Sequence, residues 1–123
     1  IVNPIEGPTP VVEIIGDHFQ LTHKLESLLK KFLDDEHLNN DSIVFITDNK
    51  TALLLEYESG IAKWKLVAHR PKAVSEIQVV SVEEFKGLES DMVVYIHSGD
   101  TTNNMNYIAY TRAKYYLIEL IRR

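Results

Sequence analysis

The tightest limit on the fold comes from residues 79–96, which hold two apolar runs separated by a polar elbow. Residues 79–80 lead into the elbow, and residues 92–96 lead out of it. Both runs consist of β-branched or other apolar residues and are too short for a helix, so they predict two buried strands. Gly87 lies in the elbow, where a residue without a side chain lets the backbone approach another group closely. The elbow is therefore a candidate functional site.

The rest of the chain alternates between further apolar runs and amphipathic segments. Asp17 is a suitable N-cap, because Gln20 follows three residues later and leucines follow at helical spacing. Strands are predicted over residues 11–15, 42–47, 62–69 and 117–121, and helices over residues 17–32 and 51–58 and from Thr101 or Thr102 to Arg112. About six strands and three helices in this order favour an α/β fold with a mainly parallel sheet covered by helices on both faces.

Length and composition are typical of one globular domain. The chain has 123 residues, of which 45% are hydrophobic and 25% are charged. It contains no cysteine, which excludes disulfides and thiolate metal sites. No apolar run approaches the roughly 20 residues that span a membrane, so we expect a cytoplasmic protein. Residues 1–10 hold three of the four prolines and have the composition of a linker, and we expect the chain, which begins at Ile1, to be one domain of a longer protein.

Two motifs in the second half of the chain carry a family resemblance. Residues 81–89 are SVEEFKGLE and residues 107–114 are YIAYTRAK, and each motif leads into an apolar run. Together, and in this order, they resemble motifs V and VI of superfamily 1 DNA helicases of the UvrD/Rep type. Glu83 stands where the UvrD-type pattern has a histidine, and with Phe85 the first motif also resembles the Upf1-like branch. The resemblance implies a RecA-like fold and the C-terminal motor domain of an ATP-dependent helicase.

The resemblance also implies roles for individual residues. Arg112 would act as an arginine finger that reaches the γ-phosphate of ATP, which a missing N-terminal RecA-like domain would hold together with Mg²⁺. Glu89 would accept a hydrogen bond from the ribose, and Gly87 would let the backbone approach the phosphates. The implied nucleotide-binding residues are Lys86, Gly87, Glu89 and Thr111, and the implied contacts with single-stranded DNA are Ser81 and Glu83.

Departures from the family pattern limit what the chain can do alone. It contains no loop of the form GxxxxGK[ST] and no acidic pair placed after a strand to hold Mg²⁺, so we expect no ATP hydrolysis without another domain. In the family an arginine that reaches the terminal phosphate stands about where Thr47 is, so that in this chain either Lys50 or no residue would take over this role. Ligands of open α/β sheets gather at the carboxyl ends of strands, and we expect the elbow and Arg112 to converge there.

Each candidate residue also has a purely structural interpretation. Arg112 at the end of a helix is favourable for the helix dipole alone, and Glu89 could pair with Lys86 on the surface. Trp64 could stack on a base, although a single tryptophan in a strand is more often a core residue. Residues 34–37, with the sequence DDEH, are typical of a frayed helix end rather than a metal site. The five histidines show no metal-ligand spacing, so we expect no bound metal.

The net charge leaves a second function open. A formal charge of −5 argues against tight binding of nucleic acid by this domain alone, unless a local basic patch forms. The residues available for such a patch are Lys63, Lys65, Arg70 and Lys72. The acidic charge, Glu83 and the lack of an arginine at Thr47 favour a non-enzymatic binding or regulatory module with a helicase-like fold. A flavodoxin-like or receiver-like domain is a weaker interpretation, because the acidic cluster and the flavin phosphate loop of such domains are missing.

Overall fold

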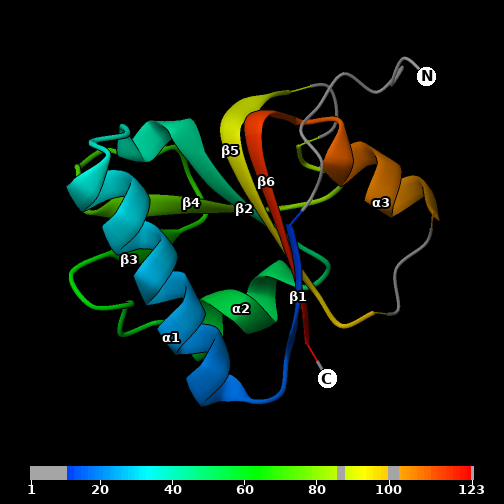
Figure 1. The fold of residues 1–123 in the computed structure, drawn as a ribbon, viewed down its shortest axis with the longest axis horizontal. Coiled ribbons are helices and arrows are strands. Elements are labelled where there is room, and N and C mark those ends of the chain that lie inside the picture. Colours follow the sequence, from blue (N-terminus) through cyan, green and yellow to red (C-terminus); the bar gives the residue numbers. More distant parts are fainter. Residues whose placement is uncertain (1–10, 86–87, 100–102, 123) are drawn as a thin grey trace.

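The protein is built around one sheet of six parallel strands, which runs through the middle of the molecule (Figure 1). The computed structural model describes residues 11–85, 88–99 and 103–122. In space the strands follow the order β1-β6-β5-β2-β4-β3. Their bounds are Val11–Ile15 for β1, Ile43–Thr47 for β2, Lys65–Val67 for β3, Glu76–Ser81 for β4, Ser90–His97 for β5 and Ala113–Arg122 for β6.

Helices cover both faces of this sheet (Figure 1). One face carries α1 (His18–Leu29), its π-helical extension η1 (Lys30–Asp35) and α2 (Lys50–Glu56). The opposite face carries α3 (Asn103–Tyr110), and a short 3-10 helix, η2 (Asn40–Ser42), leads into β2. The predicted α/β fold, with a parallel sheet and helices on both faces, is confirmed.

The sheet separates two apolar layers. In β2, Ile43 and Phe45 pack into the layer beneath α1 and α2, whereas Val44 and Ile46 pack into the layer beneath α3. All residues of β2 are buried, as expected for a central strand of a parallel sheet. Burial of each large apolar side chain contributes about 1.5–3 kcal/mol, so these alternating residues fix which face each helix covers.

The predicted start of α1 is confirmed. The Asp17 carboxylate accepts a hydrogen bond from the backbone N–H of Gln20 at 2.8 Å, and the Gln20 side chain accepts one from Gly16 N at 2.6 Å. Leu21 and Leu25, on the inner face of the helix, are fully buried. Spanning the bilayer would require a longer and more apolar helix than any in the part of the chain that the structure describes.

The region before β3 differs from the prediction. The sequence predicts a strand over residues 62–69, but β3 covers only part of this range, because Ile61 and Trp64 exchange backbone hydrogen bonds of 2.8 and 2.9 Å across a tight turn. Ala62 in this turn has a φ of 53°, which is incompatible with a strand. A Cβ at Gly60, whose φ is 89°, would lie 2.7 Å from the carbonyl oxygen of Trp64, so the turn requires glycine.

Other predicted boundaries also need correction. The last strand begins at Ala113 rather than at residue 117. The sequence predicts its start too late because the first half of the strand is largely exposed and lacks an apolar pattern. Within the described residues no α-helix connects β3 to β4 or β4 to β5, which agrees with the elbow predicted between the last two of these strands. The acidic residues after α1 end an ordered π-helix rather than a frayed one, and Asp34 binds Lys63 at 2.8 Å. Thr101, Thr102 and the linker-like residues 1–10 lie outside the described residues.

A charged cluster joins the carboxyl end of β6 to α2. Arg122 donates to both carboxylate oxygens of Glu56, at 2.6 and 2.8 Å, and Nδ1 of His18 lies 2.6 Å from one of them. Burial alone would raise the pKa of Glu56, but the hydrogen bonds from Arg122 and His18 outweigh it and hold the pKa below its ordinary value of 4.5. Because the folded-state pKa is lowered, the cluster stabilises the fold fully above about pH 4.5 and loses this effect as the pH falls through the folded-state pKa.

Replacing the guanidinium of this cluster should destabilise the fold in a pH-dependent manner. Arg122→Gln should lower the free energy of unfolding at neutral pH by roughly 1–3 kcal/mol, because it removes a bidentate, charge-assisted pair. Urea unfolding followed by circular dichroism should show this difference shrinking at acidic pH, where Glu56 is protonated. Lys30→Gln breaks only the exposed pair with Glu26 at 3.3 Å and should change stability by less than about 0.5 kcal/mol. An equal deficit for Arg122→Gln at neutral and acidic pH would contradict the role of the Glu56 charge.

Candidate functional site

The predicted elbow is a crossover connection between two parallel strands. It runs from the side of the sheet where the strands end, called the carboxyl edge below, to the side where they begin, called the amino edge. We call residues 82–89 the crossover, although residues 86–87 lie outside the described part. It leaves β4 at Ser81, on the carboxyl edge, and enters β5 at Ser90, on the amino edge, because β4 and β5 run in the same direction. Val82 and Phe85 anchor it, since both side chains are buried in the apolar layer beneath α3.

Ser81 and Glu84 cap each other at the start of the crossover. Ser81 N donates to the Glu84 carboxylate at 2.9 Å, and Ser81 Oγ accepts from Glu84 N at 3.2 Å. Lys50, the first residue of α2, binds the other carboxylate oxygen at 2.8 Å. The hydrogen bond from Lys50, followed by the one from Ser81, lowers the pKa of Glu84. The sequence analysis missed Glu84, although its S-x-x-E spacing from Ser81 is a known capping signal.

Arg112 meets the other end of the crossover. The chain leaves α3 at Tyr110 and enters β6 at Ala113, so Arg112 lies immediately before the strand. The Arg112 carbonyl oxygen accepts from Ser90 N at 2.8 Å. Its Nη1 lies 3.5 Å from the carbonyl oxygen of Leu88, at the limit of a hydrogen bond. The guanidinium and the end of the crossover therefore lie side by side, as the sequence predicts.

The edge on which they meet differs from the prediction. The sequence predicts that Arg112 and the crossover meet at the carboxyl ends of the strands. In the structure, Arg112 and Glu89 adjoin the first residues of β6 and β5, which pair with each other at the amino edge. The reason is that a connection between parallel strands must return over the sheet, so it finishes at the amino end of the next strand. Ser81 and Glu83, in contrast, lie where the prediction places the site, at the carboxyl end of β4.

Thr47 and Lys50 are remote from Arg112. Thr47 pairs with Ile96 near the last residue of β5, whereas Arg112 adjoins the first residue of that strand. The distance along the strand is roughly 20 Å at about 3.3 Å per residue. Lys50 follows Thr47 at the carboxyl edge, so it cannot contact the same phosphate as Arg112.

Part of the Arg112 side chain is buried without a hydrogen-bond partner. Its Nε is shielded from solvent and finds no acceptor among the residues that the structure describes. An unsatisfied buried donor costs about 1–3 kcal/mol, which is unusual for a residue with a purely structural role. The neighbouring Thr111 differs, because its hydroxyl donates to the carbonyl oxygens of Tyr107 at 2.9 Å and Ile108 at 3.1 Å. Thr111 could therefore only accept a hydrogen bond from a ligand.

A hollow of about 290 Å³ adjoins the crossover and includes Glu89 in its wall. Glu89 is exposed, and Val80, Phe85 and Leu88 add apolar surface beside it. Arg70 and Gln78 also line the hollow. The exposed Glu89 carboxylate can accept hydrogen bonds from hydroxyl groups, and the Arg70 guanidinium in the same wall can donate to oxygen acceptors.

The remaining predicted residues fall into two groups. Glu83 is exposed and follows Ser81 by two residues, so the predicted DNA contacts lie at the carboxyl edge, away from Arg112. Lys86 and Gly87 lie outside the described residues. The candidate site is consequently divided between two edges of the sheet, with the crossover connecting them.

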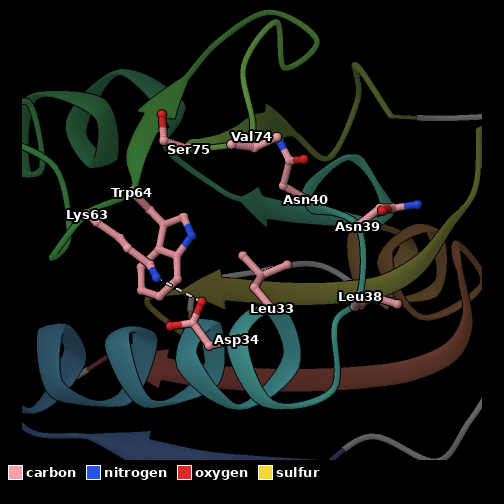
Figure 2. A pocket seen from close by; sticks show the side chains of 9 residues that line it. All are labelled: Leu33, Asp34, Leu38, Asn39, Asn40, Lys63, Trp64, Val74 and Ser75. Atoms are coloured by element: carbon pink, nitrogen blue, oxygen red, sulfur yellow. Dashed lines mark hydrogen bonds and ion pairs between the residues drawn. The ribbon is translucent and has the colours of Figure 1, made fainter.

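Trp64 and its surroundings form a separate pocket on the α1 face (Figure 2). Trp64 is only 3% exposed, which makes it a core residue whose ring is not free to stack on a base. The pocket has a volume of about 360 Å³, and Lys63 and Asp34, which point toward each other in Figure 2, neutralise one another at 2.8 Å. Lys63 is thereby removed from the predicted basic patch.

Metal binding finds no support in side-chain clustering. Across residues 11–85, 88–99 and 103–122, no three histidine, cysteine, aspartate or glutamate side chains lie close enough together to hold an ion.

Comparison with known proteins connects the fold to a helicase domain. No protein-family model matches the chain, and no curated protein matches it. Among solved structures, the chain is similar to the C-terminal domain of a possible DNA helicase from Lactobacillus plantarum, with a TM-score of 0.71 and 18% sequence identity. The match covers 94% of this chain and 74% of that chain. At this level of identity the likeness establishes a shared fold.

Removing the unsatisfied donor of Arg112 should not weaken the fold. Arg112→Met keeps a long side chain but deletes the buried N–H, so the free energy of unfolding should stay unchanged or rise by up to roughly 1 kcal/mol. Urea unfolding followed by circular dichroism measures this, with Arg122→Gln as an arginine whose loss should destabilise. If Arg112→Met destabilises as much as Arg122→Gln, Arg112 is a structural residue.

Proposed function

We propose that this chain is the second motor domain of a cytoplasmic, ATP-dependent DNA helicase of superfamily 1, similar to the UvrD/Rep type. The observation that carries the proposal is the contact between Arg112 and the end of the crossover, at 3.5 Å from Leu88. Motifs V and VI of the family are separate in sequence, and in this chain their counterparts meet at one edge. The fold shared with the C-terminal domain of a possible DNA helicase supports the same conclusion.

In this proposal Arg112 completes an ATP site whose other wall belongs to the first motor domain. A guanidinium suits this role because its planar fork matches phosphate oxygens and keeps its charge. Nε of Arg112 has no partner among the described residues, so no hydrogen bond at this atom ties the guanidinium to the domain. Arginine fingers in related NTPases accelerate phosphoryl transfer by about 10³-fold or more. Glu89 would bind the ribose, and Lys86 and Gly87 would contact the phosphates, while Mg²⁺ would be held by the first domain. Thr111 would lie beside the phosphates, with its hydroxyl hydrogen kept by the end of α3.

The same proposal assigns the carboxyl edge to single-stranded DNA. Ser81 Oγ accepts from Glu84 N, so the Ser81 hydroxyl hydrogen remains free to donate to a phosphate oxygen. Val82 and Phe85 fix the crossover to the sheet between this edge and Arg112. Closure of the two motor domains around ATP would thus act on a segment that begins at the DNA contact.

The finger assignment is tested by turnover in the full-length protein. Arg112→Ala should lower ATP hydrolysis at least about tenfold with the fold intact, because it removes the charge that stabilises the transferring phosphoryl group. Lys114→Ala, which removes an exposed cation two residues away, should retain wild-type turnover. Wild-type turnover in Arg112→Ala would end the assignment.

A non-enzymatic binding or regulatory module is the second candidate. The carboxyl edge favours it, because Glu83 is exposed there and Glu84 neutralises Lys50 at 2.8 Å. The chain also carries a net charge of −5, which opposes nucleic-acid binding. A GxxxxGK[ST] loop encoded upstream in the same gene would favour the motor, and its absence there would favour the module.

The DNA edge can be tested through Glu83. Glu83→Gln removes one anion beside Ser81, so the dissociation constant for a fluorescent single-stranded oligonucleotide should fall roughly twofold to fivefold at low salt. The difference should shrink as salt screens the charge. Glu36→Gln makes the same change in net charge at an exposed position beyond η1, toward the amino edge, and should have less effect. Equal effects of both variants, measured by fluorescence anisotropy, would show that only net charge matters.

A further inference from the structure

A buried polar network connects α3 to the sheet beneath it. Glu119 of β6 is buried, with 6% of its side chain exposed, and both of its carboxylate oxygens have partners. The Tyr110 hydroxyl donates to one at 2.7 Å, and Nε2 of His97 lies 2.5 Å from the other. Nδ1 of His97 accepts from Gly99 N at 3.0 Å, so the proton of a neutral imidazole is on Nε2 and is donated to Glu119.

The network fixes the last residue of α3 through a side-chain hydrogen bond to the sheet. A buried carboxylate requires hydrogen-bond donors, and removing one leaves an uncompensated charge in the core. One of the two donors to Glu119 is Tyr110, where α3 ends. Burial, followed by the hydrogen bond to Glu119, raises the pKa of Tyr110, so its hydroxyl remains a donor. The carboxylate therefore holds the helix end against β6.

Tyr110 is positioned to transmit this restraint to the candidate site. Side chains of a helix incline toward its N-terminus, and Tyr110 accordingly reaches back over the sheet to Glu119 rather than toward Arg112. Two residues later, Arg112 N donates to Ala109 O at 3.2 Å and the Arg112 carbonyl oxygen accepts from Ser90 N. The turn that carries Arg112 is thus held between the tyrosine anchor and the start of β5.

We propose that Tyr110, Glu119 and His97 are positioning residues that set the location of the Arg112 guanidinium at the amino edge. The proposal deepens the motor function and rests on it for its catalytic consequence. Among the described residues, the hydrogen bonds of Glu119 go to Tyr110 and His97 rather than to Arg112 or Glu89, so we expect its effect on catalysis to pass through the turn that carries Arg112. This gives Tyr110, which lies within the second quoted motif but has no role implied by the resemblance, a specific role.

Hydrogen exchange on this 123-residue chain tests the positioning without ATP. Tyr110→Phe deletes the anchoring hydroxyl and keeps the ring. The amides of Thr111 and Arg112 should then exchange at least about tenfold faster, beyond any change in global unfolding. Tyr57→Phe is the control, because Tyr57 likewise uses its hydroxyl in a hydrogen bond, at 2.9 Å from that of Thr22, but lies on the opposite face of the sheet. Unchanged exchange at both amides in Tyr110→Phe would overturn the proposal.

Turnover of the full-length protein tests the catalytic consequence. Tyr110→Phe should lower kcat roughly fivefold or more, with KM for ATP within about twofold, because a displaced finger weakens transition-state contacts. In an Arg112→Ala background the same change should have no further effect. A wild-type kcat in Tyr110→Phe, or an additive loss in the double variant, would overturn the role. If wild-type protein hydrolyses no ATP while the exchange result holds, the motor function fails and the restraint on Arg112 stands.

Discussion

The backbone ladder on both sides of β5 is the constraint on which the rest of the structure depends. β5 pairs with β2 on one side and with β6 on the other, and its residues are almost all buried, so its amide groups have no alternative partners in water. The first residue of the strand, Ser90, binds Arg112 through its backbone and the carbonyl oxygen of Ser42 through its hydroxyl at 2.8 Å. The register between β5 and β6 shifts between Ser90 and Met92, where the crossover joins the sheet. Irregular pairing of this kind re-aims neighbouring residues and is common beside functional sites.

Much of the fold follows from local signals in the sequence. The apolar runs of β2 and β5 identify buried strands because both faces of a parallel sheet are covered, and Asp17 marks a helix start through a hydrogen bond that needs no distant partner. The boundaries of β3 and β6 are harder to predict from the sequence, because part of each predicted region is set by pairing and turn geometry rather than by burial. The left-handed backbone at Ala62 shortens β3, and no side-chain pattern announces a positive φ at alanine.

The proximity of Arg112 and the crossover was predictable from the sequence, whereas the edge at which they meet was not. Motif order and spacing identify Arg112 and the crossover, and their proximity is confirmed by the contact with Leu88. Their edge is a property of topology, since it depends on β4, β5 and β6 all being parallel. The network around Glu119 gives no sequence signal at all, because its three members come from β5, α3 and β6 and meet only after folding. Sequence patterns report on neighbours along one element, whereas buried charges are satisfied across several.

The single tryptophan has a practical consequence. Trp64 is enclosed in the layer beneath α1 and α2, and Lys63 lies 5.0 Å from the centre of its ring (Figure 2). The sheet separates this layer from α3 (Figure 1) and from the buried side chains of Val82 and Phe85 in the crossover. Intrinsic emission from this indole therefore reports most directly on the packing of the layer beneath α1 and α2. A dye attached near α3 would supply the complementary signal, so that the two faces of the sheet can be followed separately in one sample.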